Sequence, residues 1–288
     1  MKTVLTIAGF DPSSGAGVTA DLMVFAAHGL FGTACITALT VQSTLGVLST
    51  HPVSNEILSS TLDCLNADLP PSGIKIGMLS CRINAIKVDS YIRQLRLQHS
   101  GLGRGFEIPI VLDPVLRSSS GRELLDPAGI EVLQDSLLSI VDWVTPNLDE
   151  LGVLTGRPVD SRGDVPAACA ALQDRVAEKS GGHHRLGIFA TGGHLDPPDD
   201  FLMMPGGEGI WLPGERVVTQ STHGTGCALS SAFLSRLVLG DASQEAAKAA
   251  KRYVSEALRT AVQHGLGRGP MNHLWLLSNE KDQVSMAG

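Results

Sequence analysis

The chain has 288 residues, of which 43% are hydrophobic, 18% are charged and only 4% are aromatic. This composition is typical of a globular protein and excludes a disordered chain, a collagen-like chain and a small disulfide-rich domain. The 22 Lys and Arg residues and 29 Asp and Glu residues give a net charge of -7, without a basic tract. We therefore do not expect nucleic acid as a partner.

The first half of the chain alternates between β-branched clusters of strand length and longer segments with helical spacing of apolar residues. The pattern predicts strands at residues 4–8, 33–39, 73–78 and 108–113. It predicts helices at 19–29, 55–66 and 83–97. No charged residue lies between Asp21 and Glu56, but glycines and polar residues divide this stretch into pieces shorter than the roughly 20 apolar residues of a membrane span. We expect no membrane association.

The second half continues the alternation, with strands predicted at 141–147 and 186–191. Helices are predicted at 129–138, 148–156, 167–178, 228–240 and 243–263. Gly206-Gly207 between two apolar runs predicts an antiparallel hairpin at a sheet edge, with strands at 201–205 and 209–213. The whole pattern predicts an α/β fold of three layers, helix on sheet on helix, with a mostly parallel central sheet. Without a repeat or linker, we expect one domain over 1–288, with a frayed polar tail at about 279–288.

The cysteines are five in number and never form a C-x-x-C pair, which indicates neither a disulfide framework nor a structural zinc site. This usage favours a reducing cytoplasm. The amino-terminal apolar run ends at Asp11-Pro12, too early for the core of a signal peptide, so we expect no export.

In open α/β sheets, ligands bind beyond the carboxyl ends of the strands. Several predicted strands run into polar residues at that point: Gly9 and Asp11, then Asp113, then Asn147 with Glu150, and then Thr191. Each of these is a candidate site, and an ordinary turn is the alternative for any one of them.

The strongest candidate is Thr222–Cys227, with the sequence THGTGC, directly before a predicted helix. The glycines allow a ligand to approach the backbone, and the free N–H groups of Gly224, Thr225 and Gly226 with the helix dipole favour a bound phosphate. This interpretation requires the loop to be open to a ligand and not filled by side chains. The alternative is that the glycines only permit a tight loop.

Cys227 falls in the first turn of that helix, where the dipole is expected to lower the pKa of a thiol and allow it to accept a proton. The alternative is a small buried hydrophobic residue. Asp113 and Glu150 are candidates to hold Mg²⁺, which proteins bind through one or two carboxylates together with phosphates and water. Their alternatives are an Asp-Pro turn and a helix N-terminal acid.

Residues 15–20, GAGVTA, fit the G-x-G-x-x-A fingerprint of dinucleotide-binding proteins. That fingerprint also needs an acid about 20 residues further on, where this chain has none. A P-loop motif is absent as well. A dinucleotide-dependent oxidoreductase is therefore only a distant alternative.

The chain resembles the hydroxymethylpyrimidine and phosphomethylpyrimidine kinases of thiamine biosynthesis, in the ribokinase-like superfamily. The resemblance spans almost the whole chain, in the family's order, through the stretches TIAGFDPSSGAGVTADL, ITALTVQSTLGV, KIGML, VLDPV, TPNLDE, TGGH, HGTGC and GRGPMNH. It implies a homodimeric kinase, dependent on ATP and Mg²⁺, that phosphorylates 4-amino-5-hydroxymethyl-2-methylpyrimidine and then its monophosphate.

The resemblance also implies roles for individual residues. It places the anion hole at Gly224, Thr225 and Gly226 with Cys227 as the base, and the metal at Asp113 and Glu150. It places the pyrimidine at Gly9, Asp21, Gln42 and Met78, and the nucleotide near Asn147, Thr191, Gly193 and Thr222. From the residue types alone, the alternatives are that Asp21 is a helix-terminal acid and that Met78 is a core residue.

The chain departs from the family pattern at the phosphate end. Two family lysines are replaced by Ser119 and Thr191, and an Asn of the Q-N-T signature is Ser43. The loss of positive charge is expected to weaken the second phosphorylation more than the first, unless Arg117 or Arg122 supplies it. A pyridoxal-type vitamin kinase and a non-catalytic pyrimidine sensor are the alternative functions.

Overall fold

The computed structural model describes residues 1–100, 108–118 and 120–277. The tail expected at 279–288 and Ser119 lie outside the described residues. The strands are β1 (Thr3–Phe10), β2 (Phe31–Ser43), β3 (Gly46–Pro52), β4 (Ile74–Ile76), β5 (Ile110–Leu112), β6 (Trp143–Val144), β7 (Gly187–Ala190), β8 (Asp200–Met203) and β9 (Gly209–Leu212). The α-helices are α1 (Gly17–Ala27), α2 (Asn55–Asp68), α3 (Arg82–Ser100), α4 (Pro127–Asp135), α5 (Leu148–Thr155), α6 (Val165–Lys179), α7 (Thr225–Leu239) and α8 (Ser243–Arg259).

All these strands join one sheet in the order β3-β2-β1-β4-β5-β6-β7-β8-β9. The six strands from β2 to β7 in this order pair in parallel. β3 at one end, and β8 with β9 at the other, pair antiparallel. The mostly parallel sheet predicted from the sequence is confirmed, and so is the predicted hairpin at its edge.

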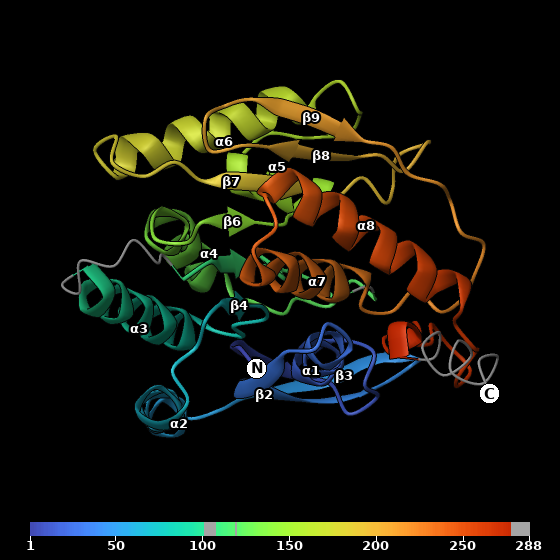
Figure 1. Cartoon of the computed structure of the whole chain (residues 1–288), viewed down its shortest axis with the longest axis horizontal. Coiled ribbons are helices and arrows are strands. Elements are labelled where there is room, and N and C mark those ends of the chain that lie inside the picture. Colours follow the sequence, from blue (N-terminus) through green and yellow to red (C-terminus); the bar gives the residue numbers. More distant parts are fainter. Residues whose placement is uncertain (101–107, 119, 278–288) are drawn as a thin grey trace.

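Helices cover both faces of the sheet (Figure 1). α1, α7 and α8 share one core, which includes Phe233 of α7. α2 to α6 share the other, which includes Leu172 of α6. Successive residues of a strand point to opposite faces, so Val111 joins the first core while Ile110 and Leu112 join the second. This arrangement confirms the predicted three layers.

Helix α7 lies against the middle of the sheet because its buried residues are small. Ser230, Ser231, Ala232 and Ser235 are all fully buried. Small side chains let the helix approach its neighbours closely, and the serine hydroxyls find partners inside: the Ser235 Oγ donates to the Ser231 carbonyl oxygen at 2.7 Å. The amino terminus of α7 is thereby held near the carboxyl ends of the strands.

The strand order reverses at β1, which lies between β2 and β4. In open α/β sheets such a reversal leaves a crevice at the carboxyl ends of the two strands. β1 and β4 bring Gly9 and Met78 together there, since a Cβ on Gly9 would lie 2.8 Å from the Met78 sulfur. The topology thus places the expected ligand site beside the amino end of α7.

Several boundaries differ from the predicted ones. β2 extends over Phe31–Ser43 and pairs with β3, a strand that the sequence did not predict. The last long helix ends at Arg259, four residues before the predicted end at Gln263. The side-chain amide of Gln263 instead donates to the carbonyl oxygens of Gly265 and Gly267, within a glycine-rich loop.

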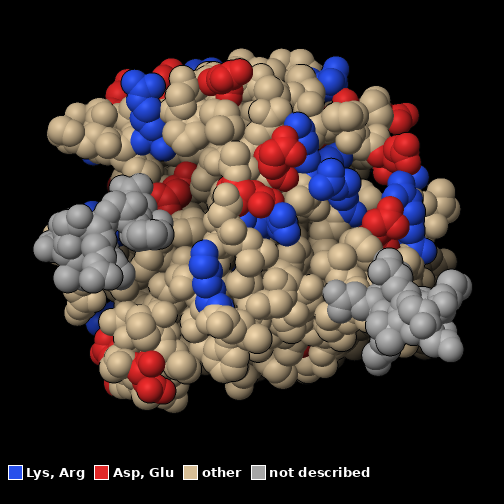
Figure 2. All heavy atoms as spheres, in the orientation of Figure 1, with Lys and Arg blue, Asp and Glu red and all other residues tan. Residues whose placement is uncertain are grey.

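None of the described helices combines the length and the apolar character needed to cross a membrane. Figure 2 shows Lys and Arg side chains among Asp and Glu side chains on the face that carries α7 and α8, without a patch of one sign. The surface charges of this face are therefore mixed.

Candidate active site

The amino terminus of α7 has the free backbone donors that an anion site requires. Gly224 has a φ of 79°, and no side chain caps the helix. A Cβ on Gly224 would lie 1.8 Å from the Gly15 carbonyl oxygen, so only glycine fits. Gly226 is exposed, and a Cβ there would meet only the Asp113 Oδ2, at 4.0 Å. Side chains therefore do not fill the space beside Gly226. An anion can reach the backbone N–H groups at this end of the helix.

Cys227 lies in the first turn of α7, but its thiol does not have the lowered pKa that we expected from the helix dipole. Burial raises the pKa of Cys227 to about 12, even though the charge of Lys75 and the backbone N–H of Gly17 oppose the rise. The expectation of a lowered pKa is wrong because desolvation of the thiolate outweighs the dipole. A thiol with this pKa stays protonated at neutral pH, and its hydrogen bond to Asp113 lowers the pKa of that carboxyl against the effect of burial.

Asp113 and Glu150 form a pair of buried carboxyls below the amino end of α7. Asp113 accepts a hydrogen bond from the Ser230 Oγ at 3.2 Å, and burial raises its pKa although Lys75 opposes the rise. Burial and the charge of Asp113 raise the pKa of Glu150 to about 8. Each carboxyl makes ionisation of the other less favourable. A cation that binds between them stabilises the ionised form of both.

This donor set fits Mg²⁺ in part. Among the described residues there is no group of three or more His, Cys, Asp or Glu that could hold a metal ion. Two carboxylates are nevertheless what Mg²⁺ takes from a protein when phosphates and waters supply its other ligands. Asp113 and Glu150 therefore suit a metal that arrives with a nucleotide better than a resident metal.

Gly9, Gln42 and Met78, which we expected at the pyrimidine, all reach the crevice beside β1. Met78 packs with Ala38 and Leu124 in a small apolar cluster. Gln42 lies four residues after Ala38 on β2, hence on the same face of the strand. Its side-chain amide is 2.9 Å from the His223 Nε2.

Asp21 is placed differently, because it is fully buried within a network of hydrogen bonds. It accepts bonds from the Thr6 Oγ1 at 2.6 Å, from the Ser231 Oγ at 2.8 Å and from the Lys75 Nζ at 2.8 and 2.9 Å. None of its surface is available to a ligand in this structure. Its contact with the pyrimidine stays a prediction that would require this network to open.

Lys75 is the functional candidate that the sequence analysis missed. It is fully buried in the middle of β4, and the charge of Asp21 raises its pKa despite the opposing effect of burial. A signal was present, since a lysine between isoleucines in an apolar strand needs a buried partner. The sequence did not identify that partner, which lies 54 positions away.

Two of the residues expected near the nucleotide follow β6 and β7. Asn147 and Thr191 are joined by a parallel bridge. The Asn147 Oδ1 accepts from the Glu150 N–H at 2.9 Å, and the Glu150 Oε2 accepts from the Asn147 N–H at 2.9 Å, which forms a capping box on α5. Gly193 is exposed and Thr222 is half-buried. Their contact with a nucleotide stays a prediction.

Arg117 and Arg122 do not point toward the carboxyl pair. Arg117 lies 3.9 Å from Glu123, and both side chains are 70% exposed. The Arg122 Nη1 donates to the Val47 carbonyl oxygen at 3.4 Å. Neither arginine therefore replaces the family lysines in this structure, and Ser119 itself lies outside the described residues.

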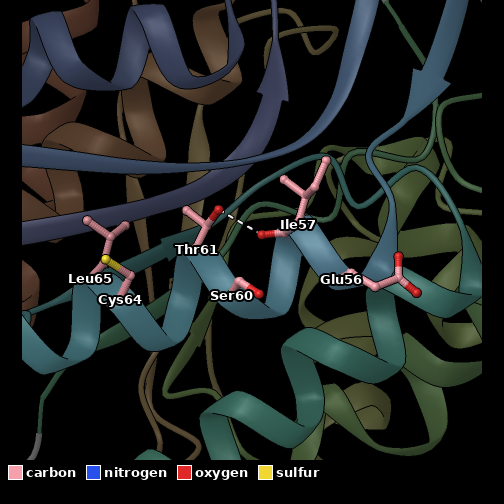
Figure 3. A pocket seen from close by; sticks show the side chains of 6 residues that line it. All are labelled: Glu56, Ile57, Ser60, Thr61, Cys64 and Leu65. Atoms are coloured by element: carbon pink, nitrogen blue, oxygen red, sulfur yellow. Dashed lines mark hydrogen bonds between the residues drawn. The ribbon is translucent and has the colours of Figure 1, made fainter.

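A separate hollow of about 470 Å³ lies on the outer side of α2 (Figure 3). It is lined by one helix only, with Ile57, Thr61 and Leu65 among its side chains. None of the candidate residues borders it, and it contains no converging polar groups of the kind that binding sites need. The candidate active site is therefore the amino end of α7 and not this hollow.

The comparison with known families shows to which family of proteins this chain belongs. A family model described as phosphomethylpyrimidine kinase matches residues 11–272. The chain belongs to the phosphomethylpyrimidine kinase family. It is therefore a kinase, as its resemblance to these enzymes implied.

Individual relatives agree with this family. The chain is 35% identical over 283 residues to the hydroxymethylpyrimidine/phosphomethylpyrimidine kinase of Staphylococcus aureus strain Mu50. The alignment covers 97% of this chain and 96% of that protein. It is 38% identical over 276 residues to the thiamine biosynthesis multifunctional protein ThiED of Corynebacterium efficiens. That alignment covers 94% of this chain and 35% of that protein.

Solved structures confirm the fold. The phosphomethylpyrimidine kinase of Clostridium difficile 630 superposes with a TM-score of 0.72 at 30% identity, covering 90% of this chain and all of that one. A pyridoxal kinase from Staphylococcus aureus superposes with a TM-score of 0.80 at 27% identity, covering 95% of this chain and 94% of that one. The three-layer fold is thus shared with a phosphomethylpyrimidine kinase and a pyridoxal kinase.

Proposed function

We propose that this phosphomethylpyrimidine kinase family member transfers the γ-phosphate of ATP to the hydroxymethyl group of 4-amino-5-hydroxymethyl-2-methylpyrimidine, and then phosphorylates the monophosphate, in thiamine biosynthesis. The observation that carries the proposal is the uncapped amino end of α7, open beside Gly226 and next to the buried Asp113–Glu150 pair. Family membership and the names of the relatives supply the substrate class.

In this proposal the N–H groups of Gly224, Thr225 and Gly226 hold the transferred phosphate and stabilise its developing charge. Asp113 and Glu150 hold Mg²⁺, which neutralises phosphate oxygens when it is bound with ATP. The attacking oxygen forms its bond to the γ-phosphorus while the bond to the ADP oxygen breaks. Gly9, Gln42 and Met78 orient the pyrimidine so that its hydroxymethyl group meets the phosphate in line.

Cys227 is the proposed acceptor of the hydroxyl proton. A protonated thiol with a pKa of about 12 cannot accept it, so the half-buried Cys227 first loses its own proton to solvent, which the nearby charge of Lys75 favours, while Asp113 stays ionised. The loose transition state of phosphoryl transfer leaves little covalent chemistry for the protein, so this proton is needed only late in the step. We expect Cys227→Ala to lower kcat by about a hundredfold and to leave the KM of the pyrimidine unchanged. A rise in KM at constant kcat would instead make Cys227 a binding residue.

A pyridoxal-type kinase is the second candidate, because the pyridoxal kinase scaffold superposes with a TM-score of 0.80. A panel of hydroxymethylpyrimidine, its monophosphate, pyridoxal and pyridoxine, with ATP and Mg²⁺, separates the two by kcat/KM. A higher kcat/KM for hydroxymethylpyrimidine supports the proposal, and a higher value for pyridoxal overturns it. Calorimetric binding of the pyrimidine without any ATP turnover would instead identify a sensor.

The monophosphate in the same panel tests the second step. Thr191 and the outward Arg117 and Arg122 leave less positive charge near the phosphates than the family pattern provides. We expect a lower kcat/KM for the monophosphate than for the unphosphorylated pyrimidine. Equal values would show that backbone N–H groups and Mg²⁺ suffice.

Three further parts of the proposal concern the whole protein. We propose that it is one domain, that it forms a homodimer and that it acts in the cytoplasm. The five cysteines as free thiols agree with a reducing compartment. Light scattering of the purified chain tests the homodimer, which a monomeric mass would contradict.

A further inference from the structure

His223 lies where three distant segments meet. Its backbone N–H donates to the Gly269 carbonyl oxygen at 3.1 Å, and the residue bridges to Pro270 of the carboxyl-terminal segment. Its ring packs on Gly15, where a Cβ would lie only 2.1 Å from the ring Cδ2. The ring is therefore held in one position, immediately before the phosphate loop at Gly224.

The His223 Nε2 has two polar neighbours, one that requires a hydrogen-bond donor and one that requires an acceptor. It lies 2.7 Å from the Asp11 Oδ2 and 2.9 Å from the Gln42 Nε2. One ring nitrogen either carries a hydrogen and donates, or has a lone pair and accepts. It cannot donate to Asp11 and accept from Gln42 at the same time, so the state of Asp11 decides the proton position.

Asp11 acts as a carboxylate here. Its Oδ1 accepts from the Ser13 N–H at 2.8 Å and from the Ser13 Oγ at 2.6 Å, and its Oδ2 accepts from the Ala16 N–H at 2.9 Å. Burial alone would raise the pKa of Asp11, but the hydrogen bonds from His223 and Ser13 hold it below its usual value. An ionised carboxylate only accepts, so the His223 Nε2 carries the hydrogen and donates to it.

This proton position fixes the orientation of Gln42. An amide NH₂ facing an Nε2–H would place two donors against each other. In the structure the Gln42 Nε2 faces His223. The inferred proton position therefore requires the flipped amide, in which Oε1 faces the Nε2–H that is shared with Asp11 and the NH₂ points away from the imidazole. Gln42 shares a strand face with Ala38, which packs on Met78 at the crevice. The NH₂ is thereby available as a donor to a ligand in the crevice.

We propose that Asp11 and His223 are positioning residues that present the Gln42 amide as a hydrogen-bond donor to an acceptor nitrogen of the substrate ring, and that His223 joins this contact to the phosphate loop. The identification of a substrate ring nitrogen as the acceptor rests on the proposed function. The position of the proton on His223 does not depend on that function.

The substrate-free test is the tautomer of His223, measured by ¹⁵N NMR of the full-length protein, with the signal assigned by its loss in His223→Gln. The wild type is expected to show a protonated Nε2. Asp11→Asn is expected to shift His223 toward the Nδ1–H form, because an Asn amide can donate to Nε2. A wild-type Nδ1–H tautomer would overturn the inference.

The kinetic test is a double-mutant cycle between Asp11 and Gln42. If Asp11 acts through Gln42, Asp11→Asn and Gln42→Ala each raise the pyrimidine KM about tenfold, and the double variant raises it little further. A KM raised about a hundredfold in the double variant would show independent effects and contradict the proposal. If Asp11→Asn fails to fold, His223→Gln takes its place in the cycle.

Ser13→Ala is the matched control, because it removes one donor to Asp11 and leaves the contact with His223 in place. It should keep the wild-type tautomer and pyrimidine KM. A wild type with no pyrimidine turnover would refute the proposed function, whereas the wrong tautomer or additive effects with intact turnover would refute this inference alone.

Discussion

Lys75 carries a positive charge into the interior of the sheet, where Asp21 forms an ion pair with it and Asp113 also contributes to its electrostatic surroundings. Both side chains are fully buried, and the carboxylate also binds Thr6 and Ser231. Together these contacts join β1, α1, β4 and α7. A buried pair of this kind adds little net stability over apolar residues, but removing one partner leaves the other charge uncompensated.

We therefore expect Lys75→Met to lower the free energy of unfolding by about 3–5 kcal/mol, as measured by urea denaturation. The double variant Lys75→Met with Asp21→Asn should recover much of the loss, because no unpaired charge is left. Lys248→Met, at an exposed ion pair, is the control and should change stability by less than about 1 kcal/mol. A Lys75→Met protein as stable as this control would contradict the account.

His28 gives a pH dependence of stability. Burial lowers its pKa below the usual 6.5, so the unfolded chain binds the proton more tightly than the folded chain does. The stability from this residue is present above pH 6.5 and is lost as the pH falls through that value toward the folded pKa. We expect His28→Gln to reduce the fall in unfolding free energy between pH 7 and pH 5, seen by urea titration at each pH.

The exposed His51 is the site of the control variant, His51→Gln, which makes the same substitution away from the core. The account is contradicted if His28→Gln and wild type lose stability equally over this range.

Among the elements, the amino end of α7 has two glycines, Gly224 and Gly226, and each position requires glycine for a different physical reason. Gly224 has a positive φ and touches the Gly15 backbone, whereas a methyl group on Gly226 would meet only Asp113, at 4.0 Å. The first glycine is therefore required by the fold. The second is required only if a ligand occupies the space in front of it.

We expect Gly226→Ala to keep the wild-type Tm and to lower kcat/KM for ATP at least about tenfold, because its methyl group occupies the phosphate position. Gly224→Ala should instead lower the Tm, because the new Cβ meets the Gly15 carbonyl oxygen. Thermal melts and steady-state kinetics of both variants check this. Full activity in Gly226→Ala would show that the phosphate lies elsewhere.

The elements that could be predicted from the sequence are those with strong local patterns. Buried parallel strands such as β5 and glycine-stopped helices such as α5 were found because apolar runs and stop residues are local signals. β3 was missed because Gly46–Pro52 contains polar residues, a glycine and a proline, and becomes a strand only by pairing with the extended β2. Tertiary pairing overrides local propensity there.

At the scale of the whole molecule, parallel topology explains why the expected site residues gathered from across the chain. Gly9, Met78, Asp113 and Gly226 come from four separate segments, and the carboxyl ends of parallel strands bring them to one edge. The contacts between them could not be predicted. The partnership of Asp11 with His223 spans 212 positions, and the pKa of Cys227 depends on burial that no local motif encodes.

In the proposed reaction, the amino end of α7 holds the phosphate being transferred. A crystal structure of the protein with ADP, Mg²⁺, aluminium fluoride and hydroxymethylpyrimidine would show where that phosphate binds. We expect a planar fluoride group within hydrogen-bond distance of the N–H groups of Gly224, Thr225 and Gly226, with the pyrimidine hydroxyl in line. A fluoride group bound away from α7, with these N–H groups facing water, would contradict it.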